Sequence, residues 1–359
     1  MRNVILSLNL PITLAIFLLI SISILIIYSS SRQLALNQSL FALAGFLIYC
    51  AISRIDYRSF KDLLKPIFIL NTILLLVVLV LGIETRGSTR WVDLGLFSIQ
   101  PSEFIKPVII LLLADFWSRH SPTWINIFHS LLWVFVPIIL VFIQPDLGTA
   151  LTISAIWVAM LFAAKISFKK ITILLVMVLV LIPIGWTMLL PYQKERITSF
   201  LSPNNDPLGV GYNLIQSTIA VGSGQIIGQG LGRGTQSRLQ FLPEFRTDFI
   251  FASIAEELGL VGSTLMIVVY LLLIIYCLKV AEKSSDSFGY LVCFGVAGML
   301  LFQSVVNIGM NVGILPITGI TLPMISYGGS SLMSTFICLG FIASVLKYQM
   351  KIDITAGYS

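Results

Sequence analysis

Long apolar runs separated by short polar segments dominate the pattern of residues along this chain. A helix needs about 20 residues to cross a bilayer, and backbone groups in lipid must bond within their own helix. We mark ten such runs, at residues 9–29, 38–53, 65–83, 102–117, 127–143, 148–164, 171–190, 249–278, 288–309 and 327–347. The pattern predicts an all-α polytopic membrane protein with about ten transmembrane helices.

The long polar stretch at about 191–248 lies between helices 7 and 8 and is rich in Gly, Gln, Ser and Asn. It keeps several apolar residues, so we expect a folded lid with short amphipathic helices. The run at 249–278 carries charges near its start, which predicts that this part lies outside the lipid core. No second soluble domain is evident, so residues 1–359 are predicted to form one integral-membrane domain with a large extracytoplasmic loop.

The composition agrees with a membrane protein and limits the kinds of molecule that the chain could contact. The chain is 57% hydrophobic and only 11% charged, with a mean hydropathy of +0.98. Its net charge of +6 indicates contact with anionic lipid and not with nucleic acid. The four cysteines show neither metal-binding spacing nor a disulfide framework. The first apolar run lacks a small-residue cleavage site and predicts an uncleaved span.

Basic residues set the expected orientation, because cytoplasmic loops are enriched in Lys and Arg. With the N-terminus in the cytoplasm, thirteen of the 22 basic residues lie on the cytoplasmic side, and an even helix count places the C-terminus there too. Eight of the other nine fall in two outer segments, 84–106 and 191–248. They are either random loop charge or a site for an anion presented from the outer leaflet.

The first outer segment contains Arg86, Arg90 and Trp91. Arginine can bind phosphate through two hydrogen bonds, and an indole ring stacks on a sugar. The same residues could instead anchor the chain at the membrane interface, where Trp and Arg are both common. Both interpretations stay open at this point.

Three polar residues open the fourth helix. Ser102 is a candidate cap and Glu103 suits the first turn of a helix. Lys106 does not suit this position, because the helix dipole disfavours a cation near the N-terminus of a helix. It therefore needs an anionic partner from the protein or a substrate. The later segment 144–149 predicts a tight turn with a helix cap.

Asp248 stands where the long loop enters a helix, close to Glu244 and Arg246. It is either a helix cap or a functional carboxylate at the mouth of a membrane protein. Glu256 and Glu257 follow about two turns deeper, where carboxylates need cationic or hydrogen-bonding partners. We expect an ion pair with an outer arginine or Lys106, or a place in a cavity.

Two glycine-rich segments lack a known nucleotide-binding spacing. The run 222–234 fits neither a Rossmann fingerprint nor a P-loop. The run could let the backbone approach a ligand closely, could bind an anion through its backbone amides, or could be a flexible loop. The interruption 307–331 breaks the helical pattern with Gly and Pro, so its backbone should be buried or face a cavity. Both histidines fall on the cytoplasmic side, which excludes a histidine-based catalytic or zinc site at the outer face.

Several blocks together resemble the SEDS family (shape, elongation, division and sporulation proteins). They are GSTRWVDLG at 87–95, QPSEFIK at 100–106, QPDLGT at 144–149, the run 234–262 with its word TDFIF, and the run 307–331. The words QPDLGTA and NIGM are more similar to the elongation members (RodA) than to the division members (FtsW).

The resemblance implies a peptidoglycan glycosyltransferase that polymerises lipid II at the outer face of the bacterial cytoplasmic (inner) membrane. It implies that Asp248 is the essential aspartate, that a divalent cation (Mg²⁺ or Mn²⁺) assists, and that the partners are a class B penicillin-binding protein and other elongation-complex membrane proteins. Relatives commonly have His where this chain has Arg246. We predict substrate-binding roles for eight residues: Arg86, Arg90, Trp91, Glu103, Lys106, Glu244, Arg246 and Ser326.

The residues fit this chemistry, because a diphosphate leaving group needs no general acid and one base is enough. We expect Asp248 to be that base in a single inverting displacement, although a metal-ligand role stays open. Two other classes remain as alternatives. One is a lipid II flippase, with Glu256 and Glu257 as coupling groups, and the other is a non-catalytic scaffold for the penicillin-binding protein. A flippase needs charge on both faces, whereas the unusual charge here lies on one.

Overall fold

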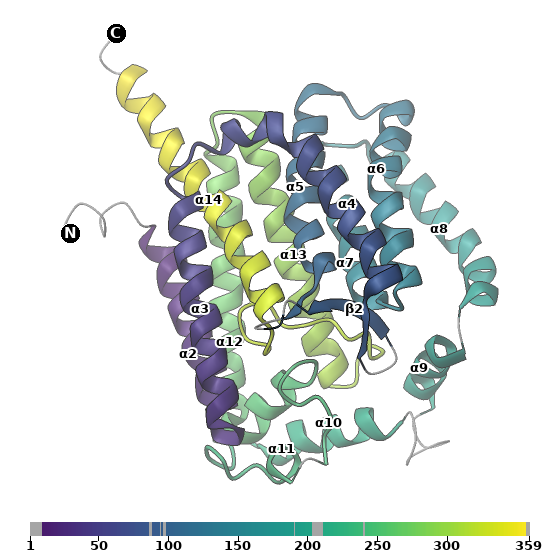
Figure 1. Cartoon of the computed structure of the whole chain (residues 1–359), viewed down its shortest axis with the longest axis vertical. Helices are drawn as coiled ribbons and strands as arrows, with labels where there is room; N and C mark the ends of the chain where they lie inside the picture. Colours follow the sequence, from purple (N-terminus) through teal and green to yellow (C-terminus); the bar gives the residue numbers. More distant parts are fainter. Residues whose placement is uncertain are drawn as a thin grey trace.

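The computed structural model describes residues 9–85, 88–93, 95, 98–189, 191–202, 211–239 and 241–356. These residues form a helical bundle with a small sheet and a folded loop at one end (Figure 1). The long helices are α2 (Leu10–Ser30), α3 (Arg32–Ile52), α4 (Leu64–Leu81), α5 (Pro101–Arg119), α6 (Trp124–Ile143), α7 (Leu147–Ala163), α8 (Phe168–Met188), α12 (Ile250–Glu282), α13 (Ser287–Asn311) and α14 (Gly329–Ala356). A 3₁₀ helix, Tyr57–Leu63, precedes α4.

The ten predicted helices are all present, which confirms the fold class. Eight helical segments of the described chain are long and apolar enough to cross a membrane. The other two predicted spans are α7, which is apolar but has only 17 residues, and α5, which carries Glu103 and Lys106 in its first two turns. These two helices are the ones whose polar faces matter below.

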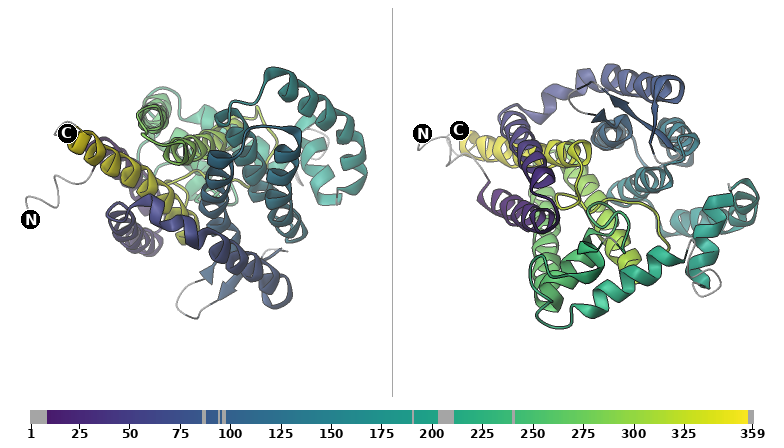
Figure 2. Two further views of the ribbon diagram at one scale, coloured as in Figure 1. Left: turned by 90° about the horizontal axis from the view of Figure 1, so that it is seen from above. Right: turned by 60° about the horizontal axis from the view of Figure 1, so that its bottom comes forward.

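Helices α5, α7, α13 and α14 form the centre of the bundle, and α8 lies at its periphery (Figures 1 and 2). The buried apolar side chains of the bundle make one continuous core, with α5 buried along most of its length. Most described side chains of α8 are exposed, as expected for a helix that faces lipid. The packing of the central helices therefore holds the polar side chains that they carry in place.

A small antiparallel sheet, which the sequence analysis did not predict, accompanies the helices at one end of the bundle. Strands β1 (Ile83–Thr85), β2 (Ser88–Asp93) and β3 (Ser98–Ile99) pair in the order β1-β2-β3. In its register, Val92 lies opposite Ile99. Strands this short give little periodic signal, although their β-branched residues favour extended structure. The sheet orients Arg90 and Trp91.

The described parts of the loop, residues 191–202, 211–239 and 241–248, are folded, as predicted. It contains α9 (Pro191–Leu201), α10 (Tyr212–Ser223) and α11 (Thr235–Arg238). Helix α10 has one buried side, because Leu214, Ser217 and Ala220 are buried whereas Thr218 and Ile219 are exposed. The loop and the sheet lie at the same end of the bundle, which we call the loop end (Figure 1).

Two interruptions shape the loop end. Helix α12 is broken at Gly259, whose φ of 66° and ψ of −163° are open only to glycine. The predicted span at 249–278 is therefore a short helix, 250–258, followed by a long one. Residues 312–328, between α13 and α14, are not helical, and Thr318 and Ser326 are buried in protein. This confirms the expectation for broken backbone at membrane depth.

Candidate active site

A cavity of about 720 Å³ opens at the loop end. Strand β2, helices α5, α7, α9, α13 and α14, the turn before α12 and the segment 318–328 all contribute to its wall. Most of its lining residues carry polar or charged side chains, and four of the predicted site residues reach it together with Asp248: Arg90, Trp91, Glu103 and Glu244. The sequence blocks that were singled out separately thus meet at one place.

The main chain around Asp248 is held rigidly. Its carbonyl oxygen accepts hydrogen bonds from Asn307 Nδ2 at 2.9 Å and Asn311 Nδ2 at 3.0 Å. The carbonyl of Thr247 accepts one from Ser326 Oγ at 2.6 Å. Both asparagines come from α13 and are completely buried. The position of the aspartate is therefore fixed by buried polar groups of the bundle, independently of its own side chain.

The carboxylate of Asp248 is not a helix cap. The N-cap position of α12 is Phe249, and no side chain caps this helix. Within the described part of the chain, no hydrogen bond to the Asp248 carboxylate is found, and its Oδ2 lies next to Gly319 in the cavity wall. Of the two interpretations from the sequence, the geometry supports the functional carboxylate.

The pKa of Asp248 is raised to about 6. Burial is the main cause, because it disfavours the charged form, and the nearby Glu244 carboxylate adds to it. Arg196 and Arg90 oppose the shift, and Asp146 contributes a smaller increase. A carboxylate with this pKa is still ionised at neutral pH and accepts a proton more readily than an ordinary aspartate.

Glu244 and Asp248 are brought together by a tight turn. Glu244 has a φ of +54°, which is uncommon for a non-glycine residue, and its carbonyl accepts hydrogen bonds from the backbone of Thr247 and Phe249. Its carboxylate accepts a hydrogen bond from Thr247 Oγ1 at 2.9 Å. The turn presents two carboxylates to the cavity, which attracts cationic groups there.

Arg90 is bound to the turn 144–149 and lines the cavity from that position. Its guanidinium donates to the carbonyls of Gln144 (3.2 Å) and Pro145, and lies 3.7 Å from Asp146. Asp146 also caps α7 by accepting a hydrogen bond from Thr149 N at 3.0 Å, which confirms the predicted turn and cap. Arg86, the other predicted arginine of this segment, lies outside the described residues.

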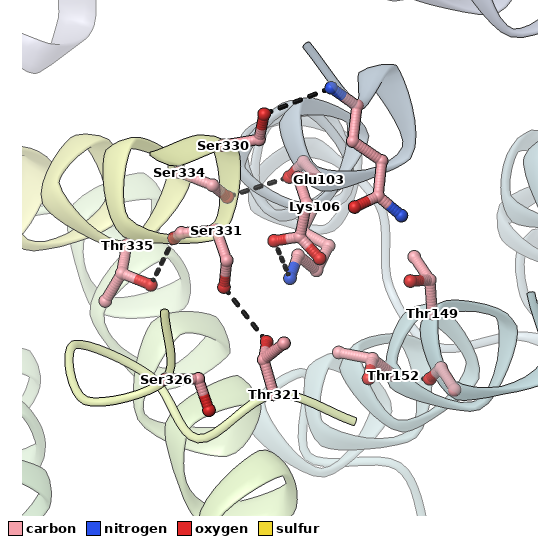
Figure 3. A network of polar contacts seen from close by, with 12 residues as sticks. Glu103, Lys106, Thr149, Thr152, Thr321, Ser326, Ser330, Ser331, Ser334 and Thr335 are labelled. Carbon is pink, nitrogen blue, oxygen red and sulfur yellow. Dashed lines mark hydrogen bonds and ion pairs between the residues drawn. The ribbon is translucent and has the colours of Figure 1, made fainter. Parts of the chain in front are cut away.

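Lys106 has its anionic partner within the protein. Its Nζ lies 2.6 Å from Glu103 Oε2, and both side chains are almost fully buried (Figure 3). Ser334 Oγ holds the carbonyl of Glu103 at 2.7 Å. Glu103 reaches the cavity lining, whereas Lys106 lies behind it. Glu103 therefore brings to the cavity wall a carboxylate whose charge is balanced by Lys106.

The prediction that Ser102 caps α5 is wrong. The helix begins at Pro101, its N-cap residue is Gln100, and that cap has no side-chain hydrogen bond. The hydroxyl of Ser102 is buried without a partner among the described residues. The helix starts two residues earlier than a Ser102 cap would place it, since proline is favoured at the first helical position.

Arg246 and Ser326 lie beside the cavity and not in its lining. Arg246 Nε donates to Ser30 Oγ at 2.8 Å, its guanidinium stacks on Phe245, and burial lowers its pKa. Ser326 is buried and connects Leu322 N to the carbonyl of Thr247. Their predicted substrate contacts are untested, and the observed contacts support the turn that carries Asp248.

Replacing Ser326 by alanine should lower the free energy of unfolding by about 1–3 kcal/mol, because it leaves the Thr247 carbonyl and the Leu322 amide unpaired. Equilibrium unfolding in mixed micelles measures this. Ser21→Ala is the matched control, since Ser21 is exposed and bonds only to a carbonyl of its own helix. Equal losses in the two variants would contradict the proposed support.

Several cavity residues were missed by the sequence analysis, among them two with long polar side chains. Arg196 reaches the cavity from α9, and Gln303 from the middle of α13. Gln303 could have been found, because an uncharged polar residue within an apolar span is a signal in itself. Arg196 was only one of several basic residues in the loop, and no spacing marked it.

The donor groups of the cavity fit a divalent cation only in a limited way. No group of three or more His, Cys, Asp or Glu side chains suited to a metal exists among the described residues. Magnesium, however, is usually held by one or two carboxylates together with substrate phosphates and water. Asp248 and Glu244 are neighbouring carboxylates whose repulsion a cation would relieve.

Comparison with known proteins agrees with the site. The model of the FtsW, RodA and SpoVE family, described as cell cycle protein, matches residues 1–351. Peptidoglycan glycosyltransferase MrdB of Escherichia coli (strain K12) is 39% identical over 346 residues, which cover 95% of this chain and 94% of that protein.

Two solved structures share the fold. A chain from a structure of a peptidoglycan synthase complex, which concerns the coordination of polymerisation and crosslinking, matches with a TM-score of 0.84 and 29% identity, covering 95% of this chain and 98% of that one. Rod shape determining protein RodA of Thermus thermophilus matches with a TM-score of 0.71 and 26% identity, covering 96% of this chain and 97% of that one. The chain therefore belongs to the FtsW/RodA/SpoVE (SEDS) family and is most like its RodA members.

Proposed function

We propose that this chain is a peptidoglycan glycosyltransferase that polymerises lipid II during cell elongation. The observation that carries the proposal is the carboxylate of Asp248, which has a pKa of about 6 and lies in a polar cavity beside Arg90 and Arg196. The relative at 39% identity is itself named a peptidoglycan glycosyltransferase.

In the proposed reaction Asp248 accepts the proton of the acceptor sugar's 4-hydroxyl. The hydroxyl oxygen forms a bond to the donor's anomeric carbon as the bond from that carbon to undecaprenyl diphosphate breaks, with inversion. The electron pair of the broken bond leaves on the diphosphate, which is stabilised by delocalised charge and needs no acid. General base catalysis of this kind contributes about 10²–10⁴-fold.

The cationic groups of the cavity suit the diphosphate. Arg90 and Arg196 line it, and Trp91 offers a ring for a sugar. Fixed positive charge stabilises the leaving group as negative charge develops there. A divalent cation, if bound, would be held by Asp248 and Glu244 with substrate phosphate oxygens and would add positive charge at the same place.

The orientation and the partner belong to the same proposal. The cavity would face outward from the bacterial inner membrane and both termini would lie in the cytoplasm, which agrees with the distribution of basic residues. The structural match to a chain of a synthase complex supports a crosslinking partner, which we take to be a class B penicillin-binding protein. Contacts with other elongation-complex proteins remain a prediction.

Fluorescent lipid II in liposomes separates the proposal from the flippase and scaffold alternatives. The purified chain, reconstituted with a transpeptidase-inactive partner and Mg²⁺, should form glycan polymer that is resolved on a gel. A flippase would instead expose inner-leaflet lipid II to an external quencher and leave it monomeric. A scaffold would do neither, and either of these results from folded, partner-bound protein would overturn the proposal.

The raised pKa of Asp248 should cost stability at neutral pH. An unfolded aspartate titrates near about 3.9, whereas the folded pKa is about 6. Between these values the folded state binds more protons, so stability falls as pH rises from roughly 4 to 6 and stays lower above. Asp248→Asn should therefore unfold at a higher temperature than wild type at pH 8. Near pH 4 the two proteins should unfold at the same temperature. Thermal unfolding with a chelator measures this, and a pH-independent gap would contradict it.

A further inference from the structure

The loop 191–248 is inserted into the break of helix α12. In an unbroken helix the amides of Leu260 and Val261 would bond to the carbonyls of Glu256 and Glu257, four residues earlier. Instead, those amides donate to Gln225 O (2.9 Å) and Ile226 O (3.1 Å). The two freed carbonyls accept from the amides of Gln229 (2.9 Å) and Gly230 (3.0 Å). Segment 225–230 thus replaces two helical hydrogen bonds with four of its own.

The side chains of the two glutamates extend the same connection. Glu256 is fully buried, and its carboxylate accepts hydrogen bonds from Gln236 N (2.8 Å), Ser237 N (3.1 Å) and Ser237 Oγ (2.9 Å) at α11. Glu257 accepts from Ser29 Oγ (2.7 Å) and Gly232 N (3.1 Å). Within the described chain neither forms an ion pair and neither lines the large cavity, so the expected need for partners is met by hydrogen bonds alone.

These contacts also explain the glycine run 222–234. Gly228 has a φ of +86°, and a side chain on it would overlap the carbonyl of Glu257. A side chain on Gly234 would meet the Glu256 carboxylate. The run does place one amide, that of Gly232, on an anion, as one interpretation proposed, but the anion is the Glu257 carboxylate of the same protein. This close packing leaves the loop little room to move independently of the short helix.

The short helix 250–258 is consequently held at both ends. At its start, Ala252 N donates to Asn311 Oδ1 at 3.0 Å and Ser253 Oγ donates to the carbonyl of Phe245 at 3.0 Å. Residue 256 lies one turn further along the same face as 252 and 253. At its far end the non-helical Gly259 separates it from the rest of α12, so the loop contacts provide the support there.

We infer that Glu256 is a positioning residue for Asp248, and that its hydrogen bonds to α11 fix the short helix on which the aspartate depends. This inference rests on the proposed function for its activity readout. The aspartate is carried by a unit that combines the short helix with residues 225–237 of the loop. Misplacement of a reacting group by about 1 Å can cost roughly 10²-fold in rate.

Glu256→Gln tests the inference, since an amide nitrogen replaces one of the two acceptor oxygens. In the liposome assay kcat should fall by about 10–100-fold, while the KM for lipid II stays near that of wild type. Hydrogen exchange of the backbone amides at 247–258 should become faster. Glu257→Gln is the matched control, because it leaves the contacts of Glu256 with α11 intact, and it should keep kcat and exchange at 247–252 close to wild type.

Ser237→Ala is the second test variant, for use if Glu256→Gln does not fold. It removes one hydrogen bond to Glu256 and keeps the buried carboxylate. It should give a smaller loss of kcat together with the same faster hydrogen exchange. Unchanged kcat and exchange in a folded Glu256→Gln or Ser237→Ala variant would overturn the inference. An equal kcat loss in Glu257→Gln would do so as well. The exchange readout needs no lipid II, so absence of polymer from wild type would contradict the proposed function without deciding the role of Glu256.

Discussion

Asp248→Asn is expected to reduce the rate of glycan polymerisation by at least about 10²-fold, the lower end of what a general base contributes. Asparagine has nearly the same shape, but its amide cannot accept the proton of the attacking hydroxyl. The main chain of residue 248 is held by Asn307, Asn311 and the Ser326–Thr247 contact, so the variant should keep the wild-type backbone. The measurement is the initial rate of polymer formation in liposomes at saturating lipid II.

Asp115→Asn is the matched control for this loss of charge. Asp115 lies at the end of α5 away from the cavity and pairs with the exposed Arg119. Its replacement should leave the rate close to that of wild type. An Asp248→Asn variant that is folded and polymerises within a few-fold of the control would exclude Asp248 from the chemical step.

Lys106→Met is expected to destabilise the protein by about 3–5 kcal/mol, because it leaves the Glu103 carboxylate buried and unpaired. The two side chains lie 2.6 Å apart and are only 3% and 7% exposed, so water cannot replace the missing partner. The free energy of unfolding in mixed micelles measures the loss. Polymerisation should also fall, since Glu103 belongs to the cavity lining.

The double variant Glu103→Gln/Lys106→Met should recover most of this stability, because replacing both members of a buried ion pair is often close to neutral. Arg119→Met provides the exposed comparison, since that ion pair has similar length but faces solvent; it should cost less than about 1 kcal/mol. A double variant no more stable than Lys106→Met would show that the pair itself is not what the single change disrupts.

The helices and the main site residue could be predicted because their signals are local. Apolar runs of bilayer length mark the spans, and polar residues next to them are costly enough to need a reason. Asp248 was singled out in this way as a helix cap or a functional carboxylate, and the family resemblance implied its role as the essential aspartate. The need of Lys106 for an anion was found from its position alone. The small sheet was missed because strands of two to six residues hardly show a period.

The remaining features depend on contacts between distant parts of the chain. Arg246 was predicted to bind substrate, which stays untested, and its side chain bonds to Ser30, which lies 216 residues away. The buried glutamates at 256 and 257 were expected to need cationic or hydrogen-bonding partners, but the sequence did not show that backbone amides of the inserted loop supply them. No periodicity or charge count reports which loop fills a break in a helix.

The pH dependence of kcat/KM for polymerisation, measured for wild type and Asp248→Asn, tests most directly whether Asp248 acts as the base. The account predicts that the wild-type value rises about tenfold per pH unit at acidic pH and levels off above the aspartate's pKa of about 6. The Asp248→Asn value should be low and lack this rise. A wild-type profile that is flat between pH 5 and 8, or the same rise in Asp248→Asn, would contradict the assignment of Asp248 as the general base.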